Sequence, residues 1–382
     1  MKAKRAAKNQ QFMSVYDKWL IFSIVSLVII GLMMVASSSV MISSKYFHTP
    51  FHFLIRQAMY LLVGIFFAYV VLRIDSSVWC KYSVHLLVLG IILLVLVLIP
   101  GVGRVVNGSR RWLAFGPISI QVSELVKLLM VVYISGYLVR HKNSVITNIV
   151  GFIKPMAVLW VVVVLLMLEP DFGATVVITS TVMAMLFLIG VKFRYYITVM
   201  LVVSVGLAII AISAPYRMAR LTAFLNPWAD QFNSGYQLTQ SLIAFGQGGW
   251  FGAGLGESVQ KLLYLPESHT DFLFAVLAEE LGLIGVLVVI GLYGILIYRG
   301  LMIGFTAFKQ DQQFAAYTAY GLTFWLGLQA IINMGVNAGL LPTKGLTLPL
   351  LSYGGASLVV NCVALALLLR IDHENRWNLL GY

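Results

Sequence analysis

The sequence predicts an all-α polytopic membrane protein with about ten transmembrane helices. Of its 382 residues, 60% are hydrophobic and 10% are charged, and the mean hydropathy is +0.93. A soluble protein of this length would carry about 25% charged residues. Apolar runs of about 18 residues or more, the length that crosses a bilayer as a helix, recur along the whole chain. The basic N-terminal segment leads into a full-length span, so we expect no cleaved signal peptide there.

The expected spans are separated by short connections, with one exception. A tail at 1–17 precedes them, a tail at 371–382 follows, and a large loop at about 215–269 separates the seventh span from the eighth. The spans lie near 18–38, 54–73, 80–100, 118–139, 152–169, 172–191, 195–214, 270–298, 313–339 and 347–370. The large loop is too long for a simple connection, and its aromatic residues argue against disorder. Within it, GYQLTQSLIAFGQGG predicts a short amphipathic helix in the membrane interface.

Basic residues fix the expected orientation. They gather in the N-terminal tail and in alternate connections near 73–81, 140–142, 192–194, 299–309 and 370–376. By the positive-inside rule these segments are cytoplasmic, so both termini face the cytoplasm and the large loop lies outside. The net charge of +12 is therefore a topology signal, and we expect no nucleic-acid partner. Cys80 and Cys362 suggest no disulfide framework.

In the stretch YLPESHTDFLFAVLAEELG, residues 264–282, the expected span carries three acids, Asp271 at its start and Glu279 and Glu280 about two turns further in. Each ionisable side chain inside a membrane costs several kcal/mol unless it is paired or hydrated. Asp271 and Glu279 are eight residues apart and share nearly one helical face, whereas Glu280 is turned away by about 100°. Ser268 followed by an acid three residues later approximates a capping box. Asp271 is therefore either a helix-start residue or a functional acid.

Seven basic residues fall on the outer side of the membrane, where the positive-inside rule disfavours them. They are Arg104, Arg110, Arg111, Arg217, Arg220, Lys261 and Lys344. One interpretation is contact with lipid headgroups. The other is a site for a phosphate-bearing ligand, because a planar guanidinium binds oxyanions through two hydrogen bonds.

Two further clusters of polar residues fall at the ends of expected spans. Glu124 and Lys127 are spaced i, i+3, and so form either an internal ion pair or part of a polar cavity. In LEPDFGAT, residues 168–175, Pro170 favours a tight reversal between two spans and Asp171 is placed to cap the next helix. For that cluster we favour the structural interpretation.

Four segments together resemble the signature of the SEDS family of bacterial cell-wall proteins. They are NGSRRWLAFGPISIQVSELVKL (107–128), LEPDFGAT (168–175), KLLYLPESHTDFLFAVLAEELG (261–282) and NMGVNAGLLPTKGLTLPLLSYGGAS (333–357). They occur in the family's order, and the resemblance extends over nearly the whole chain. PTKGLTLP is similar to the division-specific branch and not to the elongation-specific branch. Ala356, where a serine is common, is a modest departure.

The resemblance implies a peptidoglycan glycosyltransferase that polymerises lipid II at the outer leaflet of the bacterial cytoplasmic (inner) membrane, at the division septum. The acid of the HTDF motif is essential in that family, which makes Asp271 the expected general base. The expected substrate-binding residues, including cations that stabilise the undecaprenyl pyrophosphate leaving group, are Arg110, Arg111, Glu124, Lys127, Arg217, Arg220, Lys261, His269, Lys344 and Ser352.

The resemblance also implies partners. Besides lipid II and membrane lipid, these are a class B penicillin-binding protein and other division proteins. No sequence pattern demands a metal, although a divalent cation such as Mg²⁺ or Mn²⁺ could share the pyrophosphate role.

Two other functions use many of the same features. A lipid II flippase needs many spans and outward cations, but also polar groups that continue to the cytoplasmic face. Here the charges within the spans gather in the outer half. A division-complex scaffold has no need for acids and cations together in a Gly-rich loop, so we rank it last as a sole function.

Overall fold

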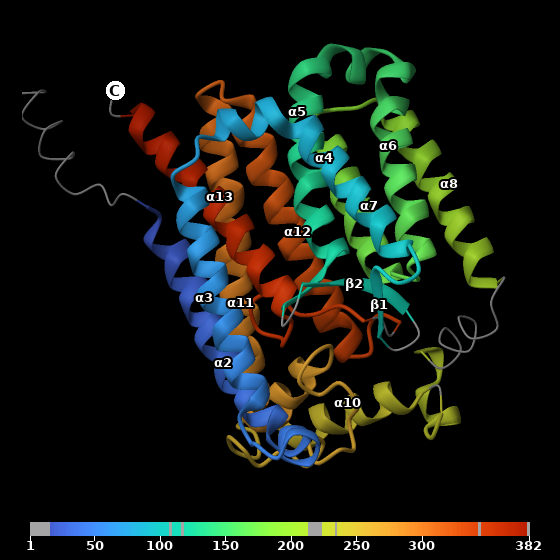
Figure 1. Cartoon of the computed structure of the whole chain (residues 1–382), viewed down its shortest axis with the longest axis vertical. Coiled ribbons are helices and arrows are strands. Elements are labelled where there is room, and N and C mark those ends of the chain that lie inside the picture. The colour runs from blue at the N-terminus through green and yellow to red at the C-terminus, as the bar shows by residue number, and fades with distance from the viewer. Residues whose placement is uncertain are drawn as a thin grey trace, which may run out of the picture.

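The computed structural model describes residues 16–106, 109–115, 118–212, 224–233, 235–342 and 345–379. Ten long helices in this part of the chain run up and down in one bundle (Figure 1). They are α2 (Lys18–Phe47), α3 (His52–Leu72), α4 (Ser76–Leu98), α5 (Val122–Thr147), α6 (Ile149–Leu168), α7 (Phe172–Leu188), α8 (Phe193–Ile212), α11 (Leu273–Lys309), α12 (Gln313–Asn337) and α13 (Gly355–Leu379). Eight of them are long and apolar enough to cross a membrane, so the predicted polytopic all-α class is confirmed.

Helix α5 forms the centre of the bundle. In its most apolar stretch 89% of the residues are buried, against 33% in α2, which presents apolar side chains to the outside. Helices α4, α6, α7 and α12 all pack on α5, while α13 packs mainly on α3, and α11 packs between α12 and α2. Close packing of α3 on α13 requires Gly64, because a Cβ there would lie 2.9 Å from the Cys362 Sγ. Small residues at helix interfaces are typical of membrane bundles.

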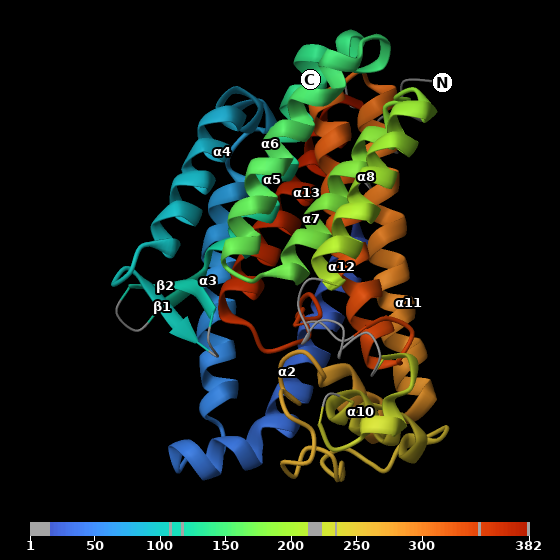
Figure 2. The same cartoon turned by 90° about the vertical axis from the view of Figure 1, so that its right-hand side faces the viewer.

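The two ends of the bundle differ. One end, called here the hairpin end, carries a small antiparallel sheet of β1 (Gly103–Val106), β2 (Ser109–Phe115) and β3 (Ile118–Gln121). Helix α10 (Tyr236–Gly248), the 3₁₀ turn η1 (Pro227–Asp230) and the segments 249–272, 338–342 and 345–354 lie toward the same end (Figure 2). The opposite end, called the terminal end, holds the start of α2 and the end of α13.

The small sheet is the main feature that the sequence analysis missed. Residues 118–121 were expected to begin a span, but they form β3, and α5 begins only at Val122. Alternating side chains and the Asn107-Gly108 dipeptide, which is favoured in two-residue hairpins, were the available signal. The last helix also differs from the prediction. Residues 347–354 precede it, and it continues to Leu379 through most of the expected tail.

Ion pairs fasten the terminal end. The Asp17 carboxylate caps α2 by accepting from Leu20 N at 2.8 Å, and it pairs with Arg299 of α11 and Arg376 of α13. The Asp17 backbone N–H donates to Asp372 Oδ2 at 2.7 Å. The first and last described helices are therefore held to each other and to α11.

Candidate active site

The start of α11 is capped by side chains from another helix, so the Asp271 carboxylate is not needed as a cap. The N-cap residue, Phe272, makes no side-chain cap hydrogen bond. Instead Asn333 and Asn337 of α12 each donate from Nδ2 to the Asp271 carbonyl at 2.9 Å, and Asn337 Oδ1 accepts from Ala275 N at 3.1 Å. The interpretation of Asp271 as a capping residue is therefore wrong.

The Asp271 side chain is half-buried and unpaired. No hydrogen bond or ion pair reaches its carboxylate from the described residues, and a Cβ on Gly345 would lie 3.1 Å from its Oδ2. Burial and the neighbouring Glu267 and Asp171 carboxylates raise its pKa to about 7, against the opposing effect of the Arg111 guanidinium. A carboxylate with a pKa near neutrality is suited to general-base catalysis at physiological pH.

Arg111 is held on one side of this site by the connection between α6 and α7. Its Nε donates to the Glu169 carbonyl at 3.0 Å and its Nη2 to the Pro170 carbonyl at 2.6 Å. The guanidinium is thus fixed by neutral acceptors. Its positive charge is not neutralised by them and acts on Asp271. Arg111 is the extra residue of a β-bulge in β2, because Arg104 pairs with Trp112 and Val105 pairs with Arg110, the predicted site residue that precedes it.

Asp171 fixes the same connection. It caps α7, accepting from Ala174 N at 3.1 Å, and this confirms the predicted role. Its other oxygen accepts from Ser123 Oγ at 2.8 Å and from Gln121 Nε2 at 3.2 Å. The sheet, the start of α5 and the start of α7 therefore converge on one carboxylate.

Glu169 is a buried acid that the sequence analysis left without a role. Its side chain is fully buried, and neither carboxylate oxygen has a hydrogen-bond partner among the described residues. Burial and the nearby Asp171 charge raise its pKa to about 8, although Arg111 lowers it. Glu169 is therefore mostly protonated at pH 7, as expected for an unpaired acid removed from water.

Glu124 and Lys127 form the predicted internal ion pair. The Lys127 Nζ lies 2.7 Å from Glu124 Oε1 and 2.6 Å from Gln329 Oε1, and it lies 5.3 Å from the centre of the Trp325 ring. Both charged side chains are buried. The other residues that line the space beside Lys127 are mainly apolar: Met130, Val131, Ile178, Thr181, Val182 and Trp325.

Lys261 was predicted to be an outward cation that binds the substrate, but the structure buries it in an ion pair. Its Nζ lies 2.8 Å from Glu280 Oε1 and 2.9 Å from Ser37 Oγ, and the whole side chain is buried. The ammonium already has its partners, so the structure gives Lys261 the role of joining the large loop to α11 and α2.

The other acid of the AEELG segment also holds the loop. Glu279 accepts from the Ser258 hydroxyl, from Val259 N at 2.8 Å and from Gln260 N at 3.3 Å. The loop packs closely on α11 here, because a Cβ on Gly252 would lie 2.1 Å from the Glu280 carbonyl oxygen.

His269 and Ser352 also have structural partners. His269 is buried, its ring lies 4.5 Å from that of Phe53 and 5.7 Å from that of Tyr353, and burial lowers its pKa despite the opposing charge of Glu267. Ser352 Oγ accepts from Leu348 N at 3.0 Å and so closes a turn. Both residues support the segment that places Gly345 against Asp271. The buried His269 Nδ1 has no hydrogen-bond partner among the described residues.

The described site is thus narrower than the predicted one, and it includes residues that were not predicted. It unites Asp271 with Arg111, Glu169, Asp171 and Glu267. Arg217, Arg220 and Lys344 lie outside the described residues. Asn333 and Asn337 could have been found from the sequence, since two asparagines four residues apart in a span are costly unless they bond to something.

The described residues do not form a metal site by themselves. Nowhere among them are three or more His, Cys, Asp or Glu side chains grouped as metal ligands. Mg²⁺ is commonly held by one or two carboxylates together with substrate phosphates. The divalent cation therefore stays a prediction, and no step below depends on it.

Comparison with known proteins gives a consistent result. The sequence profile of the FtsW/RodA/SpoVE family, described as cell cycle proteins, matches residues 18–377. A probable peptidoglycan glycosyltransferase FtsW from Legionella pneumophila is 73% identical over 96% of this chain and 93% of its own length. The corresponding protein from Coxiella burnetii is 55% identical over 94% of this chain and 96% of its own length.

Solved structures agree with these sequence matches. One is a chain from a study of how a peptidoglycan synthase complex coordinates polymerization and crosslinking. It has a TM-score of 0.78 at 28% identity, over 94% of this chain and 98% of that one. The rod shape determining protein RodA of Thermus thermophilus has a TM-score of 0.71 at 28% identity, over 96% and 99% of the two chains. The chain described here therefore belongs to the FtsW/RodA/SpoVE family, the SEDS family that its motifs resemble.

Proposed function

We propose that this protein is a peptidoglycan glycosyltransferase that polymerises lipid II into glycan strands at the outer leaflet during septal cell-wall synthesis. The observation that carries the proposal is the unpaired Asp271 carboxyl, with a pKa raised to about 7, beside the fixed guanidinium of Arg111. The names of the FtsW relatives support the same activity.

The reaction joins two lipid-linked sugars. The acceptor 4-hydroxyl attacks the anomeric carbon of the donor, a C–O bond forms, and the bond from that carbon to the undecaprenyl pyrophosphate breaks. Asp271 takes the proton of the attacking hydroxyl, and the electron pair of the broken bond leaves with the pyrophosphate. A positioned base contributes about 10²–10⁴-fold to such a step.

Arg111 supplies positive charge for the leaving group. Because only backbone carbonyls bind it in the described structure, its charge is not neutralised by a bonded carboxylate. Negative charge grows on the pyrophosphate in the transition state, so a fixed cation stabilises that state more than the bound substrate. Arg217, Arg220 and Lys344 stay predicted contributors.

A lipid II flippase fits the described interior less well. A transport path would need polar groups beyond Lys127, toward the terminal end. The space directly beside Lys127 is lined mainly by apolar residues such as Met130, Val131 and Val182. This arrangement favours chemistry at one surface.

Orientation and partners complete the proposal. The positive-inside rule places the terminal end, with both termini, in the cytoplasm and the hairpin end outside. A class B penicillin-binding protein is the proposed partner, because the synthase complex in the related structure couples polymerization to crosslinking. Other division proteins and the septal location stay predictions.

The proposal is tested with purified protein, its proposed partner and labelled lipid II. Glycan chains should form with wild-type protein and be nearly absent with Asp271→Asn. In a flippase assay with liposomes, the same preparation should not move lipid II faster than protein-free liposomes. Transport without polymerisation would reverse the assignment.

Orientation is tested separately in intact cells. After both native cysteines are replaced, a cysteine at the exposed Glu257 should react with an impermeant thiol reagent, and one at the exposed Asn143 should not. The reverse pattern would place the site on the cytoplasmic side, where it would meet the wrong leaflet.

A further inference from the structure

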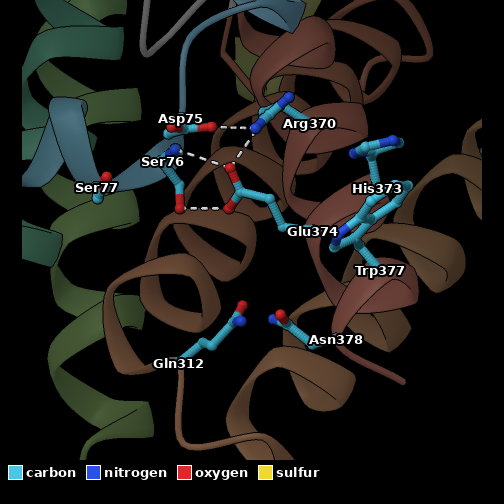
Figure 3. Close-up of a pocket in the computed structure, with 9 residues that line it drawn as sticks. All are labelled: Asp75, Ser76, Ser77, Gln312, Arg370, His373, Glu374, Trp377 and Asn378. Carbon is cyan, nitrogen blue, oxygen red and sulfur yellow. Dashed lines mark hydrogen bonds and ion pairs between the residues drawn. The ribbon is translucent and has the colours of Figure 1, made fainter. Parts of the chain in front are cut away.

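A pocket of about 360 Å³ opens at the terminal end, far from Asp271, and the proposed reaction does not use it (Figure 3). Its walls come from the start of α4, the turn before α12 and the last turns of α13. The lining residues are Asp75, Ser76, Ser77, Gln312, Arg370, His373, Glu374, Trp377 and Asn378.

The pocket carries one more negative charge than positive charge. A single cation, Arg370, pairs with both Asp75 and Glu374. Glu374 is fully engaged, because it also accepts from Ser76 N at 2.9 Å and from Ser76 Oγ at 2.5 Å. The Asp75 side chain is 63% exposed, whereas those of Arg370 and Glu374 are 18% and 17% exposed. The incompletely compensated charge is therefore accessible at the mouth of the pocket.

Aromatic and amide groups complete the lining. Trp377 is 51% exposed and stacks on His373, with ring centres 5.9 Å apart. The amides of Gln312 and Asn378 face each other across the pocket (Figure 3). The buried Gln312 Oε1 has no hydrogen-bond partner among the described residues, so it is an acceptor in need of a donor.

These three kinds of group together recognise one chemistry. A carboxylate binds a guanidinium or ammonium, an aromatic face attracts the same cation, and amide oxygens accept from cationic or peptide N–H donors. The exposed charges elsewhere at this end are predominantly basic: Lys18, Arg73, Lys81, Lys192, Arg194 and Lys309. A basic ligand would be repelled by this basic surface in general and attracted only at the acidic opening. Binding there therefore requires one cation placed in the pocket.

We propose that this pocket receives a lysine or arginine side chain from the basic cytoplasmic tail of a membrane-anchored partner protein. The proposal rests on the function and orientation proposed above, which place the pocket at the cytoplasmic membrane surface. A partner anchored by one span with its tail in the cytoplasm carries basic residues at the same depth, by the positive-inside rule. The proposed class B penicillin-binding protein is the first partner to test.

The test measures peptide binding to the full-length protein in nanodiscs of zwitterionic lipid, where no anionic lipid competes. The probe is a fluorescent synthetic peptide with the sequence of the cytoplasmic tail of the class B penicillin-binding protein. A second peptide replaces each arginine by citrulline and each lysine by glutamine, which keeps the size and removes the charge. We expect the neutral peptide to bind at least tenfold more weakly to wild-type protein.

Variants then locate the binding site. Asp75→Asn keeps the shape of the side chain and should weaken binding of the basic peptide about tenfold, and Trp377→Leu should weaken it measurably as well. Asp311→Asn is the matched control, because Asp311 is an exposed acid in the turn beside α12 that does not line the pocket. It should leave the affinity unchanged.

Each other outcome contradicts the proposal. Equal binding of the two peptides to wild-type protein would exclude recognition of a cation, and this comparison does not depend on how any variant folds. Equal effects of Asp75→Asn and Asp311→Asn would show general electrostatic attraction only. The assay contains no lipid II, so failure of the polymerase assignment and failure of this proposal are separate results.

Discussion

Replacing Asp271 by Asn should abolish polymerisation and, at neutral pH and above, make the protein more stable. The variant keeps the size of the side chain and leaves the backbone carbonyl that Asn333 and Asn337 bind. It removes only the proton acceptor. A general base contributes about 10²–10⁴-fold, so the saturating rate should fall by that factor.

The stability effect follows from the raised pKa. Raising the pKa from 3.8 to about 7 disfavours the ionised carboxylate in the folded protein by about 4 kcal/mol, at about 1.36 kcal/mol per pH unit. Because the side chain is half-buried and solvent screens part of this, we expect about 1–3 kcal/mol. In the wild type the unfolded chain ionises first, so stability falls between pH 4 and 7 and then levels off.

The measurement is the difference in thermal stability between Asp271→Asn and wild type in detergent at pH 5, 6, 7 and 8. The difference should grow across this range and reach its plateau near pH 8. Asp311→Asn, at an exposed turn, is the control and should show no such trend. A constant difference, or an Asn variant that polymerises lipid II at more than a tenth of the wild-type rate, would refute the reasoning.

Three further substitutions test two acids near Asp271 and the buried ion pair that holds the large loop. Glu169→Gln should polymerise at about the wild-type rate at pH 7, where Glu169 is mostly protonated. We expect the wild-type rate to fall as the pH rises through about 8, and Glu169→Gln should lack this fall. A pH–rate profile with an unchanged alkaline limb would contradict this. Lys261→Met should cost about 3–5 kcal/mol in unfolding free energy, because it leaves the Glu280 carboxylate buried without its cation. The double variant Lys261→Met with Glu280→Gln should recover much of that loss. Additive losses in a denaturant titration would argue against a buried pair. Asp171→Ala should cost about 1–2 kcal/mol of unfolding free energy through loss of the α7 cap, and it should slow polymerisation by loosening the connection that holds Arg111. Asp171→Asn should keep most of the stability and most of the rate. Equal behaviour of the two variants in thermal unfolding and initial-rate assays would exclude a capping role for Asp171.

The sequence was sufficient for the bundle because its signals are local. Apolar length alone places ten helices, and the spacing of Tyr236, Leu238 and Leu242 marks α10 correctly. The Glu124–Lys127 pair and the Asp171 cap are also local, since each depends on residues three positions apart. These are contacts that a chain makes largely with itself.

The site itself depends on contacts that sequence spacing does not encode. Whether Lys261 faces a ligand or a carboxylate was settled by Glu280, which lies 19 residues away across the loop, and by Ser37, which lies 224 residues away in α2. Whether Asp271 caps its helix was settled by Asn337 of the next span. The raised pKa of Asp271 also depends on burial and on the positions of Glu267, Asp171 and Arg111, which the spacing of residues does not give.

The three acids around the start of α11 have different roles. Glu279 and Glu280 hold the structure, and this explains why Asp271 can remain unpaired. Glu279 and Glu280 are fully buried and each is bound by the large loop, Glu279 through backbone N–H groups and Glu280 through the Lys261 ammonium on its Oε1. These contacts fix the loop that leads into Asp271, while Asn333 and Asn337 fix its backbone. The Asp271 side chain therefore needs no partner to hold its position.

A general base must be free to exchange a proton with its substrate, and a base held by its own ion pair would be charged but weak. Placing the structural bonds on the neighbouring residues gives a carboxylate that is both held in place and free to react.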